Sequence, residues 1–272
     1  MSDILFSVQD RTIVITGGLG QLGIQFTTAL VERGARVAIY DLEADQAKST
    51  SSLCSAVDAD QLMTVAVDVT DRASLEDALK RTQTNWETPH GLINCAALDS
   101  PPDAPAEENG PFETYPQTSW KRVMDVNVTG TFLACQVIGA AMATEGRGSI
   151  INISSIYGMI SPDQRIYEQR RTSGEEFYKP VAYSVSKSAL FNMTRYLATY
   201  WAPANVRVNT VTFGGVFNRQ DPAFVDAYCA RVPLGRMANP NDYNGAMIFL
   251  LSDAATYMTG ANIVIDGGWT AW

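Results

Sequence analysis

The sequence predicts an α/β fold with three layers, in which helices cover both faces of one doubly wound parallel sheet. Short runs of β-branched residues alternate with longer segments of helical period from one end of the chain to the other. A chain of 272 residues, of which 46% are hydrophobic and 18% charged, can also bury a large core. Such a composition excludes a disordered or low-complexity protein.

Seven segments have the length and composition of buried strands: Thr12–Thr16, Arg36–Tyr40, Met63–Val67, Gly91–Asn94, Ser149–Ile153, Arg207–Val211 and Asn262–Ile265. Helical patterns lie between them, at 21–33, 43–55, 71–86, 117–144, 183–201 and 240–252. Asp71 has the position of an N-cap, and Pro240 that of a first-turn residue. No linker or repeat interrupts the series, so we expect one domain over residues 1–272.

Two stretches fall outside this alternation, the Pro- and acid-rich segment 98–116 and the charged segment 161–180. Each follows a predicted strand. Ligand sites in doubly wound sheets lie beyond the carboxyl ends of the strands. We therefore expect both stretches to cover the active site.

Composition also restricts the partners and the compartment. With 20 Lys and Arg against 29 Asp and Glu, the net charge of −9 opposes binding to nucleic-acid phosphates. The cysteines form no C-x-x-C pair and lie in apolar or helical stretches, as reduced structural cysteines do, so we expect no disulfide and no metal site; they are Cys54, Cys95, Cys135 and Cys229. The N-terminus lacks a signal-peptide pattern, and no run of about 18 uninterrupted apolar residues occurs. We expect a cytoplasmic protein without nucleic-acid or membrane partners.

A glycine-rich loop, Thr16-Gly17-Gly18-Leu19-Gly20-Gln21-Leu22-Gly23, follows the first predicted strand and opens the first helix. Glycines there let the backbone approach a pyrophosphate at the positive end of the helix, although a plain tight turn would also use them. Asp41 at the end of the second strand favours the nucleotide, because its carboxylate can accept hydrogen bonds from both hydroxyls of an adenosine ribose. It would repel a 2′-phosphate, and positions 40–43 hold no Arg or Lys. We expect NAD in preference to NADP.

A tyrosine and a lysine, Tyr183 and Lys187, lie one helical turn apart on one face of a predicted helix. Alone, such a pair is usually a surface pair. Two further polar residues are expected nearby, Ser155 at the end of a strand and Asn127 on the preceding helix. A phenol, an ammonium, a hydroxyl and an amide therefore occur together. A phenol is a poor base at neutral pH, and an ammonium together with the positive nicotinamide ring of NAD⁺ stabilises the phenolate. We expect Lys187 to lower the pKa of Tyr183.

From Gly17 to Gly268, the chain resembles the single-domain branch of the short-chain dehydrogenase/reductase family, which has a Y-x-x-x-K motif. The motifs that carry the resemblance occur in order: TGGLGQLG, Asp41, VDVTD, LINCAA, DVNVTG, INISS, YSVSK, VRVNTVTFGG, PLGR and MTGANIVIDGG. The resemblance implies a Rossmann fold and hydride transfer between an alcohol and a nicotinamide cofactor.

The resemblance also implies roles for single residues. Tyr183 would be the general acid/base and Lys187 would hold the nicotinamide ribose. Ser155 would hydrogen-bond the reacting oxygen, and Asn127 would support a water in the proton relay. Asp68, after the third strand, would lie beside the adenine pocket, cap the next helix, or do both. The expected cofactor contacts are Gly17, Gly20, Gln21, Leu22, Asp41, Leu42, Asp68, Val69, Asn94 near the adenosine half, Ala96, Tyr183, Lys187, and Gly214 and Val216 near the nicotinamide.

The chain departs from the family pattern at four places. Its glycine spacing is typical of the longer, nucleotide-sugar-modifying branch. Ala97 replaces the last glycine of Asn-Asn-Ala-Gly, which reduces backbone freedom there. The usual Pro-Gly after the sixth strand is Phe213-Gly214-Gly215-Val216, with Phe213 either on the nicotinamide ring or in the core. Ser155 and Tyr183 are 28 residues apart. This spacing is about 15 residues longer than is usual in the family, which exceeds ordinary loop variation and indicates an insertion.

This insertion carries four acidic and four basic residues between positions 163 and 179, with aromatic residues among them. Arginine side chains at the entrance of a substrate site can bind a carboxylate, phosphate or sulfonate, because the guanidinium offers two parallel N–H donors. A lipid substrate would instead need an apolar lid. We expect a small polar, carbohydrate-like substrate, anionic sugar derivatives included; the alternative is a solvated loop or a subunit contact. The expected substrate contacts are Ser155, Tyr157, Arg165, Arg170 and Arg171.

The sequence therefore predicts an NAD-dependent dehydrogenase that acts on a secondary alcohol or a sugar lactol. The alternatives are a nucleotide-sugar epimerase or dehydratase with tightly bound NAD, and a dinucleotide-sensing protein without enzymatic activity. Trp269 and Trp272 are apolar where a chain end is usually polar, which a subunit interface or packing beside the active-site lid would explain. We expect a homo-oligomer, a dimer or tetramer.

Overall fold

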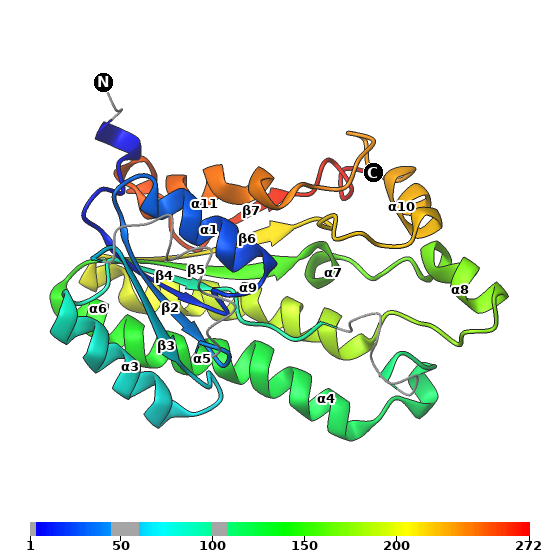
Figure 1. Ribbon diagram of the computed structural model, residues 1–272, viewed down its shortest axis with the longest axis horizontal. Coiled ribbons are helices and arrows are strands. Elements are labelled where there is room, and N and C mark those ends of the chain that lie inside the picture. Colours follow the sequence, from blue (N-terminus) through cyan, green and yellow to red (C-terminus); the bar gives the residue numbers. More distant parts are fainter. Residues whose placement is uncertain (1–3, 45–59, 100–107) are drawn as a thin grey trace.

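A parallel sheet of seven strands, in the order β3-β2-β1-β4-β5-β6-β7, forms the centre of the molecule (Figure 1). The computed structural model describes residues 4–44, 60–99 and 108–272. The strands are β1 Thr12–Thr16, β2 Arg36–Asp41, β3 Leu62–Ala66, β4 Gly91–Asn94, β5 Gly148–Ser155, β6 Val206–Phe213 and β7 Asn262–Ile265. The predicted doubly wound parallel sheet is confirmed. The chain reverses its direction of winding between β1 and β4, which is where such sheets bind ligands.

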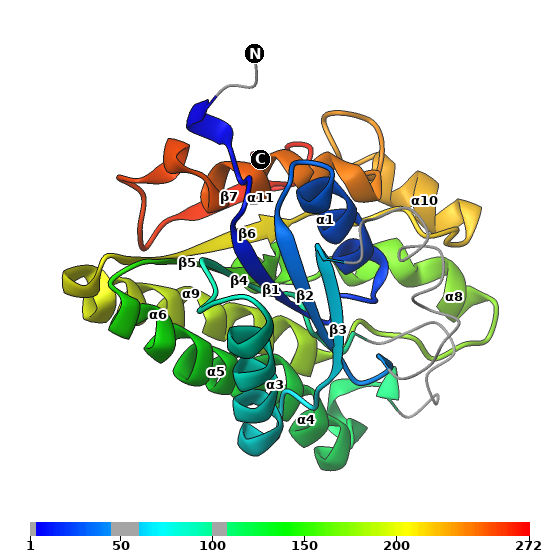
Figure 2. The same ribbon diagram turned by 60° about the vertical axis from the view of Figure 1, so that its left-hand side comes forward.

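Helices cover both faces of the sheet (Figures 1 and 2). On one face, α1 (Gln21–Val31) and α11 (Asn244–Leu251) share an apolar cluster with the strands. On the other face, α3 (Arg72–Asn85) and α9 (Val181–Trp201) contribute to a second cluster. Asp71 caps α3 as predicted, because its carboxylate accepts a hydrogen bond from the N–H of Ala73. The predicted helix 43–55 falls mostly on residues 45–59, which lie outside the described residues.

The predicted helix 117–144 is present as a nearly unbroken helix. Three α-helical pieces, α4 (Gln117–Met124), α5 (Thr131–Ala134) and α6 (Ala140–Glu145), are joined by π-helical turns at Asp125–Gly130 and Cys135–Gly139. By length and composition it could cross a membrane, but half of its most apolar window is buried. Five buried residues of its second half, Ala134, Cys135, Val137, Ile138 and Met142, belong to the second apolar cluster, so it is a core helix of the fold.

A third cluster, which we call the aromatic cap, lies beyond the carboxyl ends of β5 and β6. It joins α7 (Ile156–Met159), the 3-10 turn Gln164–Tyr167 and α10 (Pro222–Cys229), and the short helix α8 (Glu168–Thr172) follows that turn (Figure 1). The periodicity did not predict these short helices. Its buried members are Ile156, Tyr157, Ile166, Tyr167, Phe177, Tyr228, Val232, Met237 and Trp269. The insertion therefore has an apolar core of its own and is not a solvated loop.

Two aromatic residues with open alternatives now have defined surroundings. Phe213 is 4% exposed and stacks on Tyr243 with 3.9 Å between ring centroids, so it fills the core. Trp269 is 4% exposed and stacks on Tyr228 in the aromatic cap at 4.3 Å, whereas Trp272 is 78% exposed. Packing beside the segments over the site accounts for Trp269.

Candidate active site

The glycine loop after β1 has a backbone that only glycine can form at two points. Gly17 has a positive φ of 65°, and a Cβ there would lie 2.6 Å from the Cα of Ala96. A Cβ on Gly23 would lie 2.5 Å from the carbonyl oxygen of Gly17. The N-cap of α1 is Gly20, which has no side chain to cap the first N–H groups. A ligand can therefore approach the backbone of this loop closely, and no side chain caps the first N–H groups of α1. Both features fit the pyrophosphate of a dinucleotide.

Asp41 ends β2 beside this loop. Its carboxylate accepts hydrogen bonds from the N–H groups of Leu19 and Glu43, at 3.0 and 3.1 Å. The neighbouring Leu42 is 70% exposed. A carboxylate fixed in this way at the end of the second strand fits an adenosine ribose.

Asp68 follows β3 and forms a local turn. Its carboxylate accepts hydrogen bonds from both the N–H and the hydroxyl of Thr70, at 2.8 and 2.7 Å. The alternative that Asp68 caps the next helix is wrong, because Asp71 occupies that position. The buried Val69 packs against the helix 117–145, where a Cβ on Gly130 would lie 2.7 Å from its side chain.

Asn94 ends β4 with its side chain turned into the protein. Its amide donates to the side-chain oxygen of Asn152 at 2.8 Å and to the thiol of Cys135 at 3.3 Å. Asn152 in turn donates to Thr194 at 2.9 Å. The NH2 group of Asn94 is thus used in a buried polar network between β4, β5 and α9, and its expected contact near the adenosine half stays a prediction.

The loops that follow β4 and β6 are tied to their surroundings. The N–H groups of Cys95 and Ala96 donate to the hydroxyl of Thr16 at 3.2 and 3.3 Å. Gln21 donates to the carbonyl oxygen of Phe217 at 3.0 Å, which links the start of α1 to the loop after β6. Leu22 packs against the first apolar cluster. These contacts hold the glycine loop and the two strand ends at one edge of the sheet.

Three of the four predicted catalytic side chains meet at the carboxyl end of β5. Ser155 is the last residue of β5 and hydrogen-bonds the phenol of Tyr183, in the first turn of α9. Lys187, one turn later, is 4% exposed, and its ammonium donates to the carbonyl oxygen of Ile153 at 2.8 Å. The same ammonium lies 5.9 Å from the centroid of the Tyr183 ring.

Asn127, the fourth, lies in the π-helical turn Asp125–Gly130 and is 1% exposed. Its side chain accepts from the N–H of Leu98 at 2.7 Å and donates to the carbonyl oxygen of Leu98 and the hydroxyl of Ser186 at 3.0 and 2.9 Å. It thereby joins the segment after β4 to α9. π-Helical turns inside α-helices are frequent at functional sites because they re-aim a side chain.

Burial controls the titration of this centre. Burial raises the pKa of the Tyr183 phenol well above its usual value, the Asp99 carboxylate raises it further, and the hydrogen bond from Ser155 lowers it. Burial also lowers the pKa of Lys187 to about 8. For the protein alone, burial therefore dominates the pKa of Tyr183. The expected lowering of this pKa by Lys187 together with the positive nicotinamide ring stays a prediction.

The arginines of the insertion hold the insertion together. Arg171 donates to the carbonyl oxygens of Phe177 and Gln164 at 3.0 and 2.8 Å. Arg170 pairs with Glu175 at 2.6 Å and lies 3.9 Å above the ring of Phe177. These contacts use Nε of Arg170 and both terminal nitrogens of Arg171 within the insertion, so both arginines stabilise it, and their expected role at the substrate stays a prediction.

The other two expected substrate residues differ in exposure. Arg165 pairs with Asp163 at 2.9 Å, and its side chain is 80% exposed. Tyr157 is buried in the aromatic cap, with its hydroxyl 3.3 Å from that of Tyr167. Tyr157 therefore lines the inner side of the insertion, whereas Arg165 faces outward.

Sequence reasoning missed Lys179 as a site residue. Its side chain is 9% exposed, its ammonium lies 4.8 Å from the centroid of the Tyr183 ring, and it forms an ion pair with Asp99. The one signal in the sequence is its position four residues before Tyr183.

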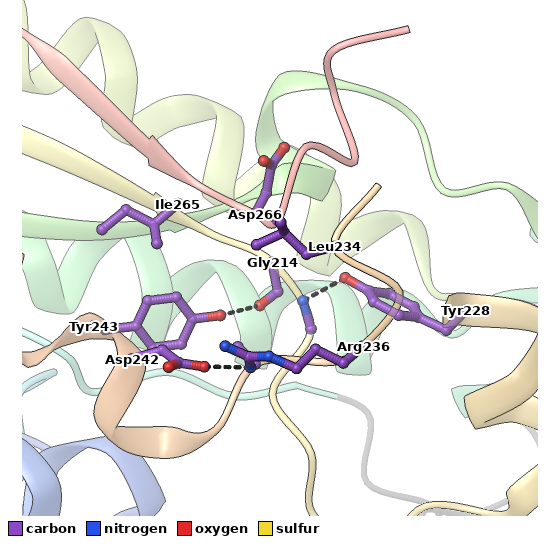
Figure 3. Close-up of a pocket in the computed structure, with 11 residues that line it drawn as sticks. Gly214, Tyr228, Leu234, Arg236, Asp242, Tyr243, Ile265 and Asp266 are labelled. Carbon is purple, nitrogen blue, oxygen red and sulfur yellow. Dashed lines mark hydrogen bonds and ion pairs between the residues drawn. The ribbon is translucent and has the colours of Figure 1, made fainter. Parts of the chain in front are cut away.

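A cavity of about 220 Å³ adjoins the loop after β6 (Figure 3). The hydroxyl of Tyr243 donates to the carbonyl oxygen of Gly214 at 3.0 Å, and the N–H of Gly215 donates to the hydroxyl of Tyr228 (Figure 3). The cavity is lined by Gly214, Gly215, Tyr228, Leu234, Arg236, Ala238, Asp242, Tyr243, Ile265, Asp266 and Gly267, so the four catalytic candidates lie outside it. Two phenols thus fix the backbone of the glycine pair, and Val216 continues from it in a bridge to Ala238.

A model of the family described as enoyl-(acyl carrier protein) reductase matches residues 20–270. Three curated relatives are each 31% identical to the chain. The match to the 2-(S)-hydroxypropyl-CoM dehydrogenase 3 of Xanthobacter autotrophicus spans 97% of this chain and 98% of that relative. The match to the D-threitol dehydrogenase of Mycolicibacterium smegmatis spans 98% of this chain and 96% of the relative. For the galactitol 2-dehydrogenase of Cereibacter sphaeroides, both shares are 98%.

Among solved structures, the chain is similar to a short chain dehydrogenase from Leptospira borgpetersenii with bound NAD⁺. The TM-score is 0.84 at 32% identity, over 99% of this chain and 96% of that one. The fold is therefore shared over nearly the whole length.

Proposed function

Because this chain belongs to the short-chain dehydrogenase/reductase family and is an NAD(P)-dependent dehydrogenase that acts on CH–OH groups, we propose that it oxidises a secondary alcohol of a small polyol or sugar-like substrate with NAD. The observation that carries the proposal is the meeting of Ser155, Tyr183 and Lys187 at the carboxyl end of β5. The three curated relatives are named dehydrogenases, and the chain matches each of them over nearly its full length. This favours a dehydrogenase reaction over that of a nucleotide-sugar epimerase or dehydratase.

The cofactor would be held by the glycine loop and the strand ends. Gly17 and Gly20 bring backbone close to the pyrophosphate, Asp41 accepts the ribose hydroxyls, and Gly214 with Val216 supports the nicotinamide end. NAD, when bound, accepts the hydride from the alcohol carbon. The preference for NAD is supported by the Asp41 carboxylate and by the lack of Arg or Lys at positions 40–43.

The protein would supply orientation and proton transfer. Tyr183 takes the proton of the reacting hydroxyl, and Ser155 hydrogen-bonds the same oxygen. Lys187 lies beside the phenol, and its positive charge stabilises the phenolate as the proton moves. Asn127 links the segment after β4 to α9 through its hydrogen bonds to Leu98 and Ser186. In this position it would support a water in the proton relay.

The substrate class is supported by the residues around Tyr183. Tyr183 packs against the aromatic cap, to which Tyr157, Tyr167 and Phe177 belong, and Lys179 with Asp99 adds charged groups beside Tyr183. An aromatic face with a few polar groups suits a small polyhydroxyl compound. Two of the relatives carry names that refer to the polyols threitol and galactitol.

We further infer a single domain over residues 1–272, since strands from both ends of the chain share one sheet. Exposed aromatic side chains on α5 and α9, Phe132, Tyr196 and Tyr200, favour a homo-oligomer, a dimer or tetramer, in which a second copy covers them. Free thiols at Cys95, Cys135 and Cys229, in the part of the chain that the structure describes, favour the cytoplasm.

The test is a screen of polyols, sugars, sugar acids and apolar secondary alcohols for NADH formation, with NADP in parallel. We expect the polyols to react and NAD to be preferred. Reaction of apolar alcohols alone would contradict the substrate class. Equal use of NADP would contradict the role of Asp41.

A further inference from the structure

Lys179 is an unusual lysine for an insertion at the surface. Its side chain is 9% exposed, and its ammonium lies 4.8 Å from the centroid of the Tyr183 ring. Burying a lysine costs desolvation and rotamer freedom, so a lysine without a role is normally solvated. Its ion-pair partner, Asp99, comes from the segment after β4, and the side chain of Asp99 is 53% exposed. The two charged groups thus approach Tyr183 from the two stretches that interrupt the alternation of strands and helices.

The insertion fixes the backbone of Lys179 on both sides. The N–H of Lys179 donates to the side-chain oxygen of Gln164 at 2.9 Å, and the amide of Gln164 donates back to the carbonyl oxygen of Lys179 at 3.2 Å. Arg171 holds the carbonyl of Gln164 at 2.8 Å. The adjacent N–H of Tyr178 donates to the carbonyl oxygen of Asn109 at 2.7 Å. These contacts make Lys179 the fixed end of the insertion.

Asp99 acts on the catalytic centre as well. Its carboxylate raises the pKa values of Tyr183, Tyr157 and Lys187, although burial has the larger effect on each. Geometry agrees with this, because Asp99 pairs with the ammonium of Lys179, which lies 4.8 Å from the centroid of the Tyr183 ring. Asp99 therefore lies beside the catalytic phenol, with half of its side chain open to solvent.

We propose that Lys179 and Asp99 form a subsite that binds the hydroxyl next to the reacting one, so that the enzyme selects a vicinal diol. This proposal rests on the proposed function and names its substrate more closely. A hydroxyl both donates and accepts, and the pair offers an ammonium donor and a carboxylate acceptor side by side. The charges of the pair cancel, so the subsite suits a neutral polyol and not an anionic sugar derivative.

The experiment compares substrates that differ in one hydroxyl. Butane-2,3-diol, threitol and galactitol carry vicinal hydroxyls, butan-2-ol lacks the second one, and 3-hydroxybutyrate carries a carboxylate instead. The wild-type enzyme is expected to oxidise the best diol with a kcat/KM at least about 10-fold above those of butan-2-ol and 3-hydroxybutyrate, as expected for hydrogen bonds to charged groups. Equal or better oxidation of either comparison compound would overturn the subsite, and this measurement needs no variant.

The variants assign the preference to the pair. Lys179→Met and Asp99→Asn are each expected to lower the ratio of kcat/KM for the best diol to kcat/KM for butan-2-ol by about 10-fold or more. Lys179→Arg keeps the charge and should retain most of the preference. Lys121→Met, on the exposed face of α4, is the matched control and should change neither substrate. Thermal unfolding and NADH binding show whether each variant is folded.

The outcomes separate the two proposals. A loss of the same size on the diol and on butan-2-ol would overturn the subsite, because Lys179 would then act on Tyr183 and not on the substrate. The function proposed above would survive that result. If the wild-type enzyme forms no NADH or NADPH from any of the compounds, the proposed function is overturned, and the subsite with it.

Discussion

The carboxylate of Asp41 accepts a hydrogen bond from the N–H of Leu19 at 3.0 Å, so the end of β2 is tied directly to the glycine loop. The glycine loop, which we propose to bind the pyrophosphate, and the carboxylate that we propose to bind the ribose are therefore linked directly. Under this proposal, selection between NAD and NADP depends on the charge of this one side chain.

Replacing Asp41 by Asn should reduce the preference for NAD. The amide keeps a hydrogen-bonding oxygen but removes the charge that repels a 2′-phosphate, so the ratio of kcat/KM for NAD to that for NADP should fall by about 10-fold or more. Steady-state kinetics with both cofactors measures the ratio. Asp71→Asn, which keeps a good N-cap away from the loop, is the control and should leave it unchanged. An unaltered ratio in Asp41→Asn would refute the assignment.

Removing the guanidinium of Arg171 should raise KM for the substrate, although Arg171 does not contact Tyr183. In Arg171→Ala the carbonyls of Gln164 and Phe177 lose their shared donor, and Lys179 is no longer held in place. We expect KM for a polyol to rise by about 5-fold or more, with a small fall in thermal stability, from the loss of two hydrogen bonds to a charged group.

Arg165→Ala is the comparison for this change, because the side chain of Arg165 is 80% exposed and its ion pair with Asp163 is local. Its KM should stay at the wild-type value. The reverse pattern, with KM raised in Arg165→Ala alone, would restore Arg165 as a substrate contact and contradict the structural role of Arg171.

The buried ammonium of Lys187 should give stability a pH dependence. In the unfolded chain its pKa is the usual 10.5, whereas burial lowers it to about 8 in the folded protein. Between these two values the unfolded chain binds more protons, so the contribution of Lys187 to the free energy of unfolding rises with pH. Below about 8 both states hold the proton and the contribution is constant.

Urea unfolding of the wild type and of Lys187→Met across this range measures that contribution. The free energy of unfolding of the wild type minus that of the variant should rise from pH 8 to pH 10.5. The exposed Lys121→Met provides the baseline, for which the same difference should be flat. A flat difference for Lys187→Met as well would show that its ammonium is not desolvated.

The sheet could be predicted from the sequence because β-branched runs report local burial on both faces. The strand ends at Thr16 and Asn94 coincide with the prediction, whereas β5 and β6 extend further, to Ser155 and Phe213. The short helices α7, α8 and α10 were missed, since one or two turns are too few to show a helical period.

Side-chain direction within the site could not be predicted in the same way. The amide of Asn94 is turned inward by Asn152, which is 58 residues away along the chain. Lys179 is buried through its contact with Asp99, and that contact forms only after folding. The guanidinium of Arg171 is a group that often binds ligands, which is why the sequence suggested a substrate contact. The carbonyls that it binds become its neighbours only once the insertion folds back on itself.

The central claim is that Tyr183 transfers the proton of the reacting hydroxyl. The most direct test compares wild type and Tyr183→Phe for the rate of NADH formation on the best polyol and for the dissociation constant of NAD, with Tyr257→Phe, at an exposed tyrosine, as the control. We predict that Tyr183→Phe loses turnover by at least about 100-fold, as for the loss of a general acid/base, and binds NAD as the wild type does. Turnover by Tyr183→Phe at the wild-type rate would contradict the account.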